Sequence, residues 1–349
     1  MLLKMQNIKL KAGRTSGFIQ SFYMILIFTV ILQILFVQIN QNVKAEESFD
    51  TWLSSYKKYA LEKGVSQETI RTAFKNVKFL EQVIKYDRKQ PEFFEDTITY
   101  VEKRANSSRV RLAKKLFNKN QNLFNEIENK FSVEKEILLA LWGIETNFGK
   151  HVGKMDIISS LATLSYDKRR RDFFSGQLLT LLKLIDDKLI DVNTLYGSWA
   201  GAYGNFQFMP SSIKQYAIDY DNNNKIELKT SLKDSLASAA NYMNSMGWKK
   251  GQPCFFQVKL TDKIKDKYVN SSARNIKYRF KINKWKQKGV LNYDGTELES
   301  DLKAALILPD GKPNTPTYLV FENYEKILKW NRSLRFGISV CTLANKIKI

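Results

Sequence analysis

The sequence predicts a mainly α-helical protein with a small β-rich insertion before its last helix. Apolar residues recur at helical spacing from about residue 48 to residue 246. After Gly251, short strand-like runs and turns replace that spacing over residues 254–323. Helical spacing then returns from about Tyr324 to the end of the chain. With 349 residues, 44% of them hydrophobic, the chain can bury a sizeable core.

The first 45 residues differ from the rest and are expected to direct export. Basic residues precede an apolar run from Phe22 to Ile39, and Val43-Lys44-Ala45 then offers small residues where a signal peptidase would cut. The alternative is an uncleaved anchor, because the run is nearly long enough to span a bilayer. In both cases the folded part is expected outside the cytoplasm.

The charge and the single histidine restrict the class of function. The formal net charge is +21, which suits an anionic partner, and export makes nucleic acid an unlikely one. An anionic wall polymer or a membrane surface fits better, and a solvated lysine-rich surface is the plain alternative. His151 is the only histidine, so a His-rich zinc site cannot be built. It lies in a polar loop sequence, which favours a surface or substrate-side position.

The two cysteines, Cys254 and Cys341, are far apart in the sequence. Cys341 falls in an apolar helical pattern, so we expect two separate buried thiols. Pairing in an oxidising compartment is the alternative.

The helical part, residues 46–253, divides at turn and capping residues. Gly64 is expected to end the first helix and Ser66 to cap the second, since these residue types favour those positions. Gln90-Pro91 marks a turn, and residues 94–130 again have helical spacing.

Ser132 is predicted to begin an apolar helix, and Ser211 or Ser212 a later one. Further helices are predicted over Phe173–Ile185 and over Leu232–Met246, the second ending at Gly247.

The β-rich part, residues 254–323, is followed by a C-terminal helix over residues 324–349 that returns to the helical part. The strand-like runs are Phe255–Val258, Lys277–Phe280, Val290–Tyr293, Ala304–Leu308 and Tyr318–Phe321, with a turn at Pro309-Asp310-Gly311.

Glu145 is the candidate catalytic residue. It ends an apolar stretch that is expected to be buried on most faces. Trp142 lies about one turn before it and Phe148 about one turn after. A carboxyl group in such surroundings is poorly solvated, which is expected to raise its pKa toward that of a general acid working near neutral pH.

Most glycosidases need a second carboxylate, and none stands out near Glu145. Asp156 and Asp167 are candidates by proximity alone. A single acid suggests that the substrate supplies the second reacting group.

Several long motifs of this chain resemble those of the B-type lytic murein transglycosylases. The similarity runs in order from about residue 85 to the C-terminus. The matching segments are Leu141-Trp142-Gly143-Ile144-Glu145-Thr146-Asn147-Phe148-Gly149, Ser160–Asp167, Arg169–Phe174, Gly197–Gly204, Gln207–Ser212, Ala240-Asn241-Tyr242, Gly247-Trp248, Leu308–Gly311 and Lys329–Ser333.

The resemblance implies a lysozyme-like helical core and a non-hydrolytic cleavage of peptidoglycan in the periplasm, with no required cofactor. Glu145 would protonate the glycosidic oxygen between N-acetylmuramic acid and N-acetylglucosamine. The same residue would then deprotonate the muramic acid 6-hydroxyl, which closes a 1,6-anhydro ring. Two alternatives remain: a hydrolytic muramidase and a non-catalytic wall-binding scaffold.

The resemblance also implies a set of substrate-binding residues. Ser198 and Gln207 would hydrogen-bond the sugar and the acid. Trp330 stands where related proteins carry tyrosine, so stacking is kept and a hydroxyl is lost. The complete set of substrate-binding candidates is Ser198, Gln207, Asn331, Tyr100, Tyr203 and Trp330.

Some family members carry a calcium loop similar to an EF-hand. Here Asp219, Asp221 and Asn223 supply oxygen ligands at loop positions one, three and five. Asn224 replaces glycine at position six, and Thr230 replaces the bidentate glutamate at position twelve. Asp234 is a candidate substitute ligand, and a solvated polar turn is the alternative.

Overall fold

The structure is a computed structural model of the chain. It describes residues 47–89, 95–294, 296, 298–312 and 314–349, together with the single residues Met24 and Gln33. The predicted turn at Gln90-Pro91 and nearly all of the predicted leader lie outside the described residues. Among the residues described, no helix has the length and apolar character needed to cross a membrane. Residues 53–349 form one compact unit.

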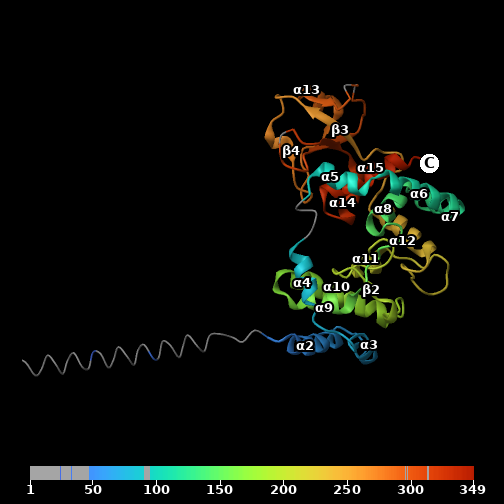
Figure 1. Ribbon diagram of the computed structural model, residues 1–349, viewed down its shortest axis with the longest axis vertical. Coiled ribbons are helices and arrows are strands. Elements are labelled where there is room, and N and C mark those ends of the chain that lie inside the picture. The colour runs from blue at the N-terminus through green and yellow to red at the C-terminus, as the bar shows by residue number, and fades with distance from the viewer. Residues whose placement is uncertain are drawn as a thin grey trace, which may run out of the picture. The chain divides into compact units, whose positions relative to one another are not determined.

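Helices dominate the chain before residue 250 (Figure 1). They are α2 (Phe49–Glu62), α3 (Gln67–Ala73), α4 (Glu81–Arg88), α5 (Thr97–Arg104), α6 (Ser107–Lys119), α7 (Gln121–Phe131), α8 (Lys135–Thr146), α9 (Ile157–Tyr166), α10 (Arg171–Asp186), α11 (Pro210–Tyr216) and α12 (Leu232–Ser245), with the 3-10 turns η2 (Lys168–Arg170) and η3 (Val192–Thr194). A short antiparallel pair, β1 (Met155–Asp156) with β2 (Tyr196–Gly197), lies between them.

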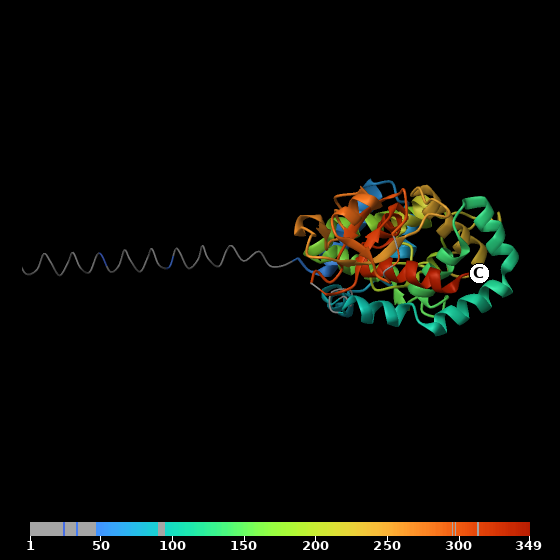
Figure 2. The same cartoon turned by 90° about the horizontal axis from the view of Figure 1, so that it is seen from above.

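The apolar helix α8 is the centre of the helical part. Its residues Ile137–Gly143 are all buried, as the sequence predicts. It packs against α6, α7, α12 and the C-terminal helix α15 (Leu334–Ile347), and these elements are drawn from above in Figure 2. A helix that is apolar all round must have neighbours on most sides, and these four supply them.

Capping residues explain where several helices begin and end. Ser66 caps α3 by accepting a hydrogen bond from the Thr69 amide, as predicted. The prediction for Ser132 is wrong: this residue takes a left-handed conformation that ends α7, and α8 begins at Lys135.

The predicted helical spacing over residues 94–130 corresponds to α5, α6 and α7, with α6 and α7 starting after Asn106 and Asn120. One further helix boundary differs from the prediction. α11 begins at Pro210, whose missing N–H costs nothing at a first helical position, so neither Ser211 nor Ser212 is its cap.

The β-rich part is a mixed sheet with the strand order β4-β7-β8-β3-β6 and with β5 paired to β7. Its elements are β3 (Phe255–Leu260), β4 (Val269–Asn270), β5 (Phe280–Lys281), β6 (Val290–Asn292), β7 (Lys303–Ile307) and β8 (Thr317–Val320), with a 3-10 turn η4 (Asp266–Tyr268) and a helix α13 (Ile282–Gln287). β4 and β7 are parallel, and the other neighbouring strands are antiparallel.

A separate hydrophobic core stabilises the sheet. The α13 residues Ile282 and Trp285 are fully buried in it, and the Trp285 indole N–H donates to the Ala304 carbonyl at 2.8 Å. Four of the five predicted runs coincide with β3, β6, β7 and β8, and the run Lys277–Phe280 reaches β5 only at Phe280. The pattern misses β4 and α13, because a two-residue strand and a six-residue helix are too short to show periodicity.

The predicted single C-terminal helix is two helices, α14 (Glu322–Trp330) and α15. Asn331 has an extended backbone, and the Ser333 hydroxyl caps α15 by accepting from the Phe336 amide. This break turns the chain after Trp330, and it fixes the position of that residue at a helix end.

The expectation of two separate thiols is wrong, because Cys254 and Cys341 form a disulfide bond with their Cα atoms 6.1 Å apart. Cys254 precedes β3, and Cys341 lies in the middle of α15. The sequence separation of 87 residues conceals this proximity, which arises because α15 returns across the helical part.

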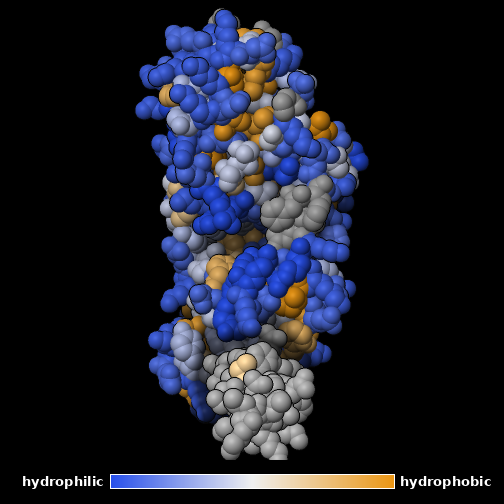
Figure 3. Space-filling view, turned by 90° about the vertical axis from the view of Figure 1, so that its left-hand side faces the viewer, coloured by the Kyte–Doolittle hydropathy of each residue, from blue (hydrophilic) through white to orange (hydrophobic). Residues whose placement is uncertain are grey.

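One face of the molecule, among the residues that the structure describes, is mostly polar (Figure 3). The face drawn in Figure 3 is largely hydrophilic, with small hydrophobic patches between the polar side chains. This agrees with the formal net charge of +21.

Candidate active site

Glu145 lies in the last turn of α8 and is half-buried. The indole N–H of Trp330 donates a hydrogen bond of 2.9 Å to its Oε1 atom. Trp330 ends α14 and lies 185 residues away in the sequence. One carboxylate oxygen is therefore held in place by a donor from the opposite end of the chain.

Trp330 is held by aromatic neighbours. Its indole stacks on Tyr242 of α12 with ring centres 4.8 Å apart, and Phe208 meets it edge-on at 5.1 Å. Tyr242 in turn stacks on Tyr216 at 4.2 Å. Burial raises the pKa of the Tyr242 hydroxyl, which keeps the phenol neutral. The indole is thus fixed before any substrate arrives.

The chain turns sharply after Glu145. Asn147, Phe148 and Gly149 all have positive φ angles, of 49°, 59° and 81°. This conformation is costly for an aromatic residue and needs support from packing. The Phe148 ring lies against Gly143, where an added Cβ would stand 2.7 Å from the ring. Gly143 therefore makes room for the ring, which explains the spacing of this motif.

Asn205 joins this turn to the rest of the site and was not singled out in the sequence. Its side-chain oxygen accepts a bond from the Trp142 indole at 3.2 Å, and its backbone carbonyl accepts one from the Thr146 hydroxyl at 2.8 Å. Its amide nitrogen donates to Ser235 at 3.1 Å. A buried asparagine needs such partners, and only the folded chain brings them together.

Arg109 of α6 is a second residue that the sequence did not indicate. Its guanidinium donates to the Gly143 carbonyl at 3.1 Å and to the carbonyls of Lys103 and Arg104 at the end of α5. Desolvation lowers its pKa, and the charge of Arg104 lowers it further. It ties the last turn of α8 to α5.

Ser198 and Gln207 shape the loop beside this turn. The Ser198 hydroxyl oxygen accepts from the amides of Ala200 and Ala202 at 3.2 and 2.9 Å. The Gln207 amide nitrogen donates to the Val152 carbonyl at 3.2 Å. Gln207 itself has a φ of 52°. Both side chains thus organise backbone near the segment that follows Glu145.

The remaining predicted binding residues differ in exposure. Asn331 directly follows Trp330 and is half-buried. Tyr203 is buried, with its hydroxyl 2.9 Å from that of Thr194, and burial raises its pKa. Tyr100 is only 1% exposed, and the Arg104 guanidinium lies 3.4 Å from its ring centre. Tyr203 and Tyr100 are therefore buried too deeply to offer a sugar much surface, and their side chains position their neighbours.

The two carboxylates weighed as partners of Glu145 have structural tasks. Asp156 caps α9 by accepting from the Ser159 amide at 2.6 Å. Asp167 accepts from the Arg88 guanidinium at 2.9 Å and caps η2. Their engagement agrees with a reaction in which the substrate supplies the second group.

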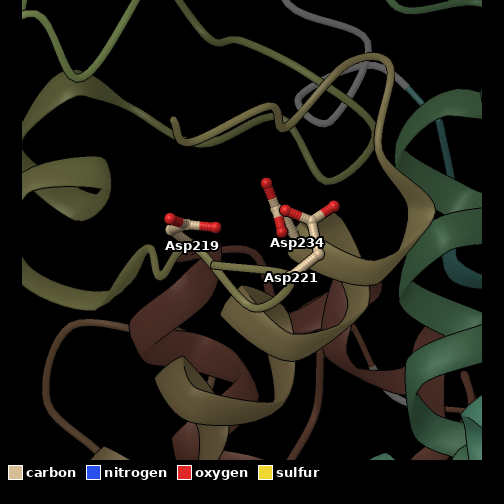
Figure 4. Close-up of side chains that lie close together, drawn as sticks. All are labelled: Asp219, Asp221 and Asp234. Atoms are coloured by element: carbon tan, nitrogen blue, oxygen red, sulfur yellow. The ribbon is translucent and has the colours of Figure 1, made fainter. Parts of the chain in front are cut away.

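The polar loop between α11 and α12 brings Asp219, Asp221 and Asp234 together. Their nearest carboxylate oxygens lie within 4.8 Å of one another, two from the loop and one from the start of α12 (Figure 4). Asn224 has a φ of 66°, so it fills the position of the usual glycine. Burial, then the charges of Asp234 and Asp219, raise the pKa of Asp221.

The donor set suits a hard dication, with one departure from an EF-hand. Asp234 is fully buried and accepts from the amides of Tyr220 and Glu227, both at 3.0 Å. The Asn223 side-chain oxygen accepts from the Lys225 amide at 2.9 Å. Asp234 thus adds a third carboxylate to a loop that has none at position twelve.

Comparison with known proteins identifies the family. The family described as "Transglycosylase SLT domain" matches residues 48–345. Membrane-bound lytic murein transglycosylase B of Escherichia coli (strain K12) is 30% identical over 234 residues, 67% of this chain and 62% of that protein. The match thus spans less than two thirds of that relative's length.

Solved structures agree with this. SltB3 from Pseudomonas aeruginosa, determined with NAG-NAM-pentapeptide and with NAG-anhNAM-pentapeptide, is 34% identical, with a TM-score of 0.79 over 86% of this chain and 80% of its own. The Escherichia coli lytic transglycosylase Slt35 in complex with calcium is 26% identical, with a TM-score of 0.71 over 84% of this chain and 92% of its own. The predicted mainly helical, lysozyme-like fold class is confirmed. This chain belongs to the transglycosylase SLT-domain family, among the B-type lytic murein transglycosylases.

Proposed function

We propose that this protein is an exported lytic transglycosylase that cleaves the β-1,4 bond between N-acetylmuramic acid and N-acetylglucosamine in peptidoglycan. The observation that carries the proposal is Glu145 at the end of a buried helix with its Oε1 atom held by Trp330. The relatives support it, since one is named a lytic murein transglycosylase and another was solved with peptidoglycan fragments.

In the proposed reaction Glu145 acts first as an acid. With Oε1 accepting the indole N–H, the proton is carried on Oε2. That proton passes to the glycosidic oxygen as the bond from the muramic acid C1 breaks, and the N-acetyl group stabilises the developing cation. The carboxylate then takes the proton of the 6-hydroxyl while O6 bonds to C1. No water is consumed, so no second carboxylate is required.

Three polar side chains near Glu145 are proposed to bind the sugars. Ser198 accepts two backbone bonds and retains its hydroxyl proton for donation to a sugar oxygen. Gln207 lies beside the segment that follows Glu145 through its bond to Val152. Asn331 directly follows Trp330, the residue that donates to Glu145, and its side chain is partly exposed.

The loop of Asp219, Asp221, Asn223 and Asp234 is proposed to hold a structural calcium ion. The oxygen donors and the left-handed Asn224 support this, as does the calcium complex of Slt35. The ion would tie α11 to α12 and has no place in the reaction.

Export is also part of the proposal. The basic and apolar residues 1–45 are proposed to carry the protein to the periplasm, either as a cleaved signal or as an anchor. The Escherichia coli relative is named membrane-bound.

Digestion of purified sacculi tests the reaction. We expect muropeptides with 1,6-anhydromuramic ends, each lighter by one water than a hydrolysed product, when the products are analysed by mass spectrometry. Products that carry the added water would instead identify a hydrolytic muramidase.

The role of Glu145 is tested by Glu145→Gln, which keeps the size of the side chain and removes the acid. We expect strand cleavage to be lost while sedimentation with sacculi persists. Unchanged cleavage would exclude Glu145 as the acid. Absence of cleavage by the wild-type protein, with binding intact, would favour a scaffold.

A further inference from the structure

Two aromatic side chains form a pair outside the residues assigned above. Trp199 follows Ser198 in the loop after β2, and Tyr86 lies on α4. Their ring centres are 6.5 Å apart, and the ring planes are inclined by 51°. Tyr86 is 43% exposed and Trp199 is half-buried. Because Tyr86 is exposed and Trp199 is only partly covered, the pair leaves ring surface open to a ligand.

The backbone under both rings is held firmly. The Ser198 hydroxyl binds two amides of the Trp199 loop. Gly201 has a φ of 87°, and a Cβ added there would stand 2.4 Å from Leu161. The loop is therefore packed closely against α9.

The helix that carries Tyr86 is fixed to the same support. The Leu80 amide, at the start of α4, donates to the Thr163 hydroxyl of α9 at 3.0 Å. At the other end of α4, Arg88 bonds to Asp167. Because α9 supports both rings, the pair is preorganised, which reduces the entropic cost of binding.

The pair is connected to the catalytic segment through backbone contacts. β1, which follows the turn after Glu145, pairs with β2 directly before Ser198 and Trp199. Gly153 lies so close to this strand that an added Cβ would stand 2.0 Å from the Gly197 carbonyl oxygen. Trp199 therefore lies on a segment that the β1–β2 pair joins to the turn after Glu145.

We propose that Tyr86 and Trp199 form a distal sugar-binding subsite, on which a pyranose ring of the glycan strand stacks at a distance from the cleaved bond. This inference rests on the proposed function. Aromatic rings suit the ligand, because one face of a β-linked amino sugar presents mainly C–H groups and the ring edges remain free for polar contacts. We expect the subsite to favour long strands, because a sugar ring bound on it adds to the contacts that the strand makes at Glu145.

The experiment compares two peptide-free substrates, a long glycan strand and a tetrasaccharide of the same disaccharide repeat. Tyr86→Ala and Trp199→Ala are expected to raise KM for the long strand about fivefold, which corresponds to the loss of one aromatic contact. They leave kcat unchanged, because the subsite binds the ground state and the transition state equally. For the tetrasaccharide, we expect both variants to keep the KM and kcat of the wild-type protein.

Two controls separate this effect from damage to the fold. Trp199→Phe keeps an aromatic ring and is expected to retain most of the preference for long strands. Tyr59→Ala removes a tyrosine of matched exposure, 40%, whose ring neighbours are Tyr56 and Lys63, and it is expected to leave both substrates unaffected.

The outcomes distinguish the two proposals. A wild-type protein that cleaves neither substrate refutes the proposed function. A wild-type protein that cleaves both, with alanine variants that keep the full preference for long strands, refutes the subsite alone. Equal losses on the long strand and the tetrasaccharide also refute it, because a distal site cannot affect a substrate too short to reach it.

Discussion

At the scale of single residues, the surroundings of Glu145 combine side chains that are distant in the sequence. Trp330 contributes an indole N–H from the end of α14, and Asn205 holds the turn that follows the acid. Trp330 lacks a hydroxyl, yet its indole N–H makes the hydrogen bond to the carboxyl group. Trp330 therefore supplies a donor as well as a ring.

This contact predicts the effect of Trp330→Phe. The change keeps an aromatic ring on Tyr242 and removes the donor to Glu145. We expect kcat to fall by about 10- to 100-fold, the contribution of a hydrogen bond to a charged group, with a small change in KM. Steady-state cleavage of glycan strands measures this.

Trp248→Phe is the matched control. The Trp248 indole donates to the Glu134 carboxylate at 2.6 Å, so the same kind of bond is lost at the other end of α8. We expect a lower melting temperature and unchanged kcat. Equal losses of kcat in both variants would contradict a specific role for Trp330.

At the scale of elements, the end of α8 determines where the acid points. The left-handed run over Asn147–Gly149 turns the chain away directly after Glu145, and the Phe148 ring occupies the space beside Gly143. The structure shows why glycine stands at position 143: the Phe148 ring occupies the space that a side chain there would need.

Gly143→Ala tests this packing. The new methyl group would stand 2.7 Å from the Phe148 ring, so the ring or the turn must move. We expect a destabilisation of about 1–3 kcal/mol by denaturant unfolding, together with reduced activity.

Gly176→Ala in α10 provides the comparison, because a Cβ there would meet nothing within 4 Å. Alanine is the better helix former, so this variant is expected to gain up to about 1 kcal/mol with unchanged activity. A Gly143→Ala variant that gains stability as Gly176→Ala does would show that only helix propensity acts at position 143, and it would contradict the packing role of this glycine.

The acidic loop gives a prediction with a defined pH dependence. Calcium binds the ionised carboxylates, so we expect it to raise the melting temperature at neutral pH. Burial and the neighbouring charges of Asp234 and Asp219 raise the pKa of Asp221. A protonated Asp221 no longer attracts calcium, so the stabilisation by calcium is lost as pH falls through the pKa of Asp221, which is higher than that of an ordinary aspartate.

Without calcium, the raised pKa of Asp221 makes the stability of the fold change with pH in the opposite direction. The folded protein then binds the Asp221 proton more tightly than the unfolded chain, so its stability decreases as pH rises through that pKa. Scanning calorimetry with and without calcium measures both trends. Asp221→Asn should abolish the difference, and a calcium effect that survives this change would place the ion elsewhere.

At the scale of the whole molecule, the C-terminal helices close the site. α15 packs on α8, and α14 carries Trp330 to Glu145. The disulfide between Cys254 and Cys341 joins α15 to the segment that enters the sheet. The disulfide thereby helps to fix α14 and α15, the helix pair that carries Trp330, whose indole donates to Glu145.

Reduction of this disulfide is expected to lower the stability of the fold by about 2–4 kcal/mol, since the bond closes a loop of 87 residues. The melting temperature of the wild-type protein should fall in dithiothreitol. A variant with both Cys254→Ser and Cys341→Ser should melt at that lower temperature with or without the reductant. A wild-type melting temperature that does not respond to reduction would contradict the role of the bond.

The sequence alone determined what depends on local pattern. Helical periodicity marked α8 as buried, the change after Gly251 marked the sheet, and the run of motifs placed Glu145 in its family. These features are readable because spacing and composition act on neighbouring residues.

The tertiary structure decided what depends on residues far apart in the chain. The bond from Trp330 to Glu145, the partners of Asn205 and the disulfide each join distant segments. Packing also buries Tyr100 and Tyr203, two of the predicted substrate-binding residues. Periodicity can assign a side chain to a face of its own helix, whereas the way that helices pack decides which side chains meet.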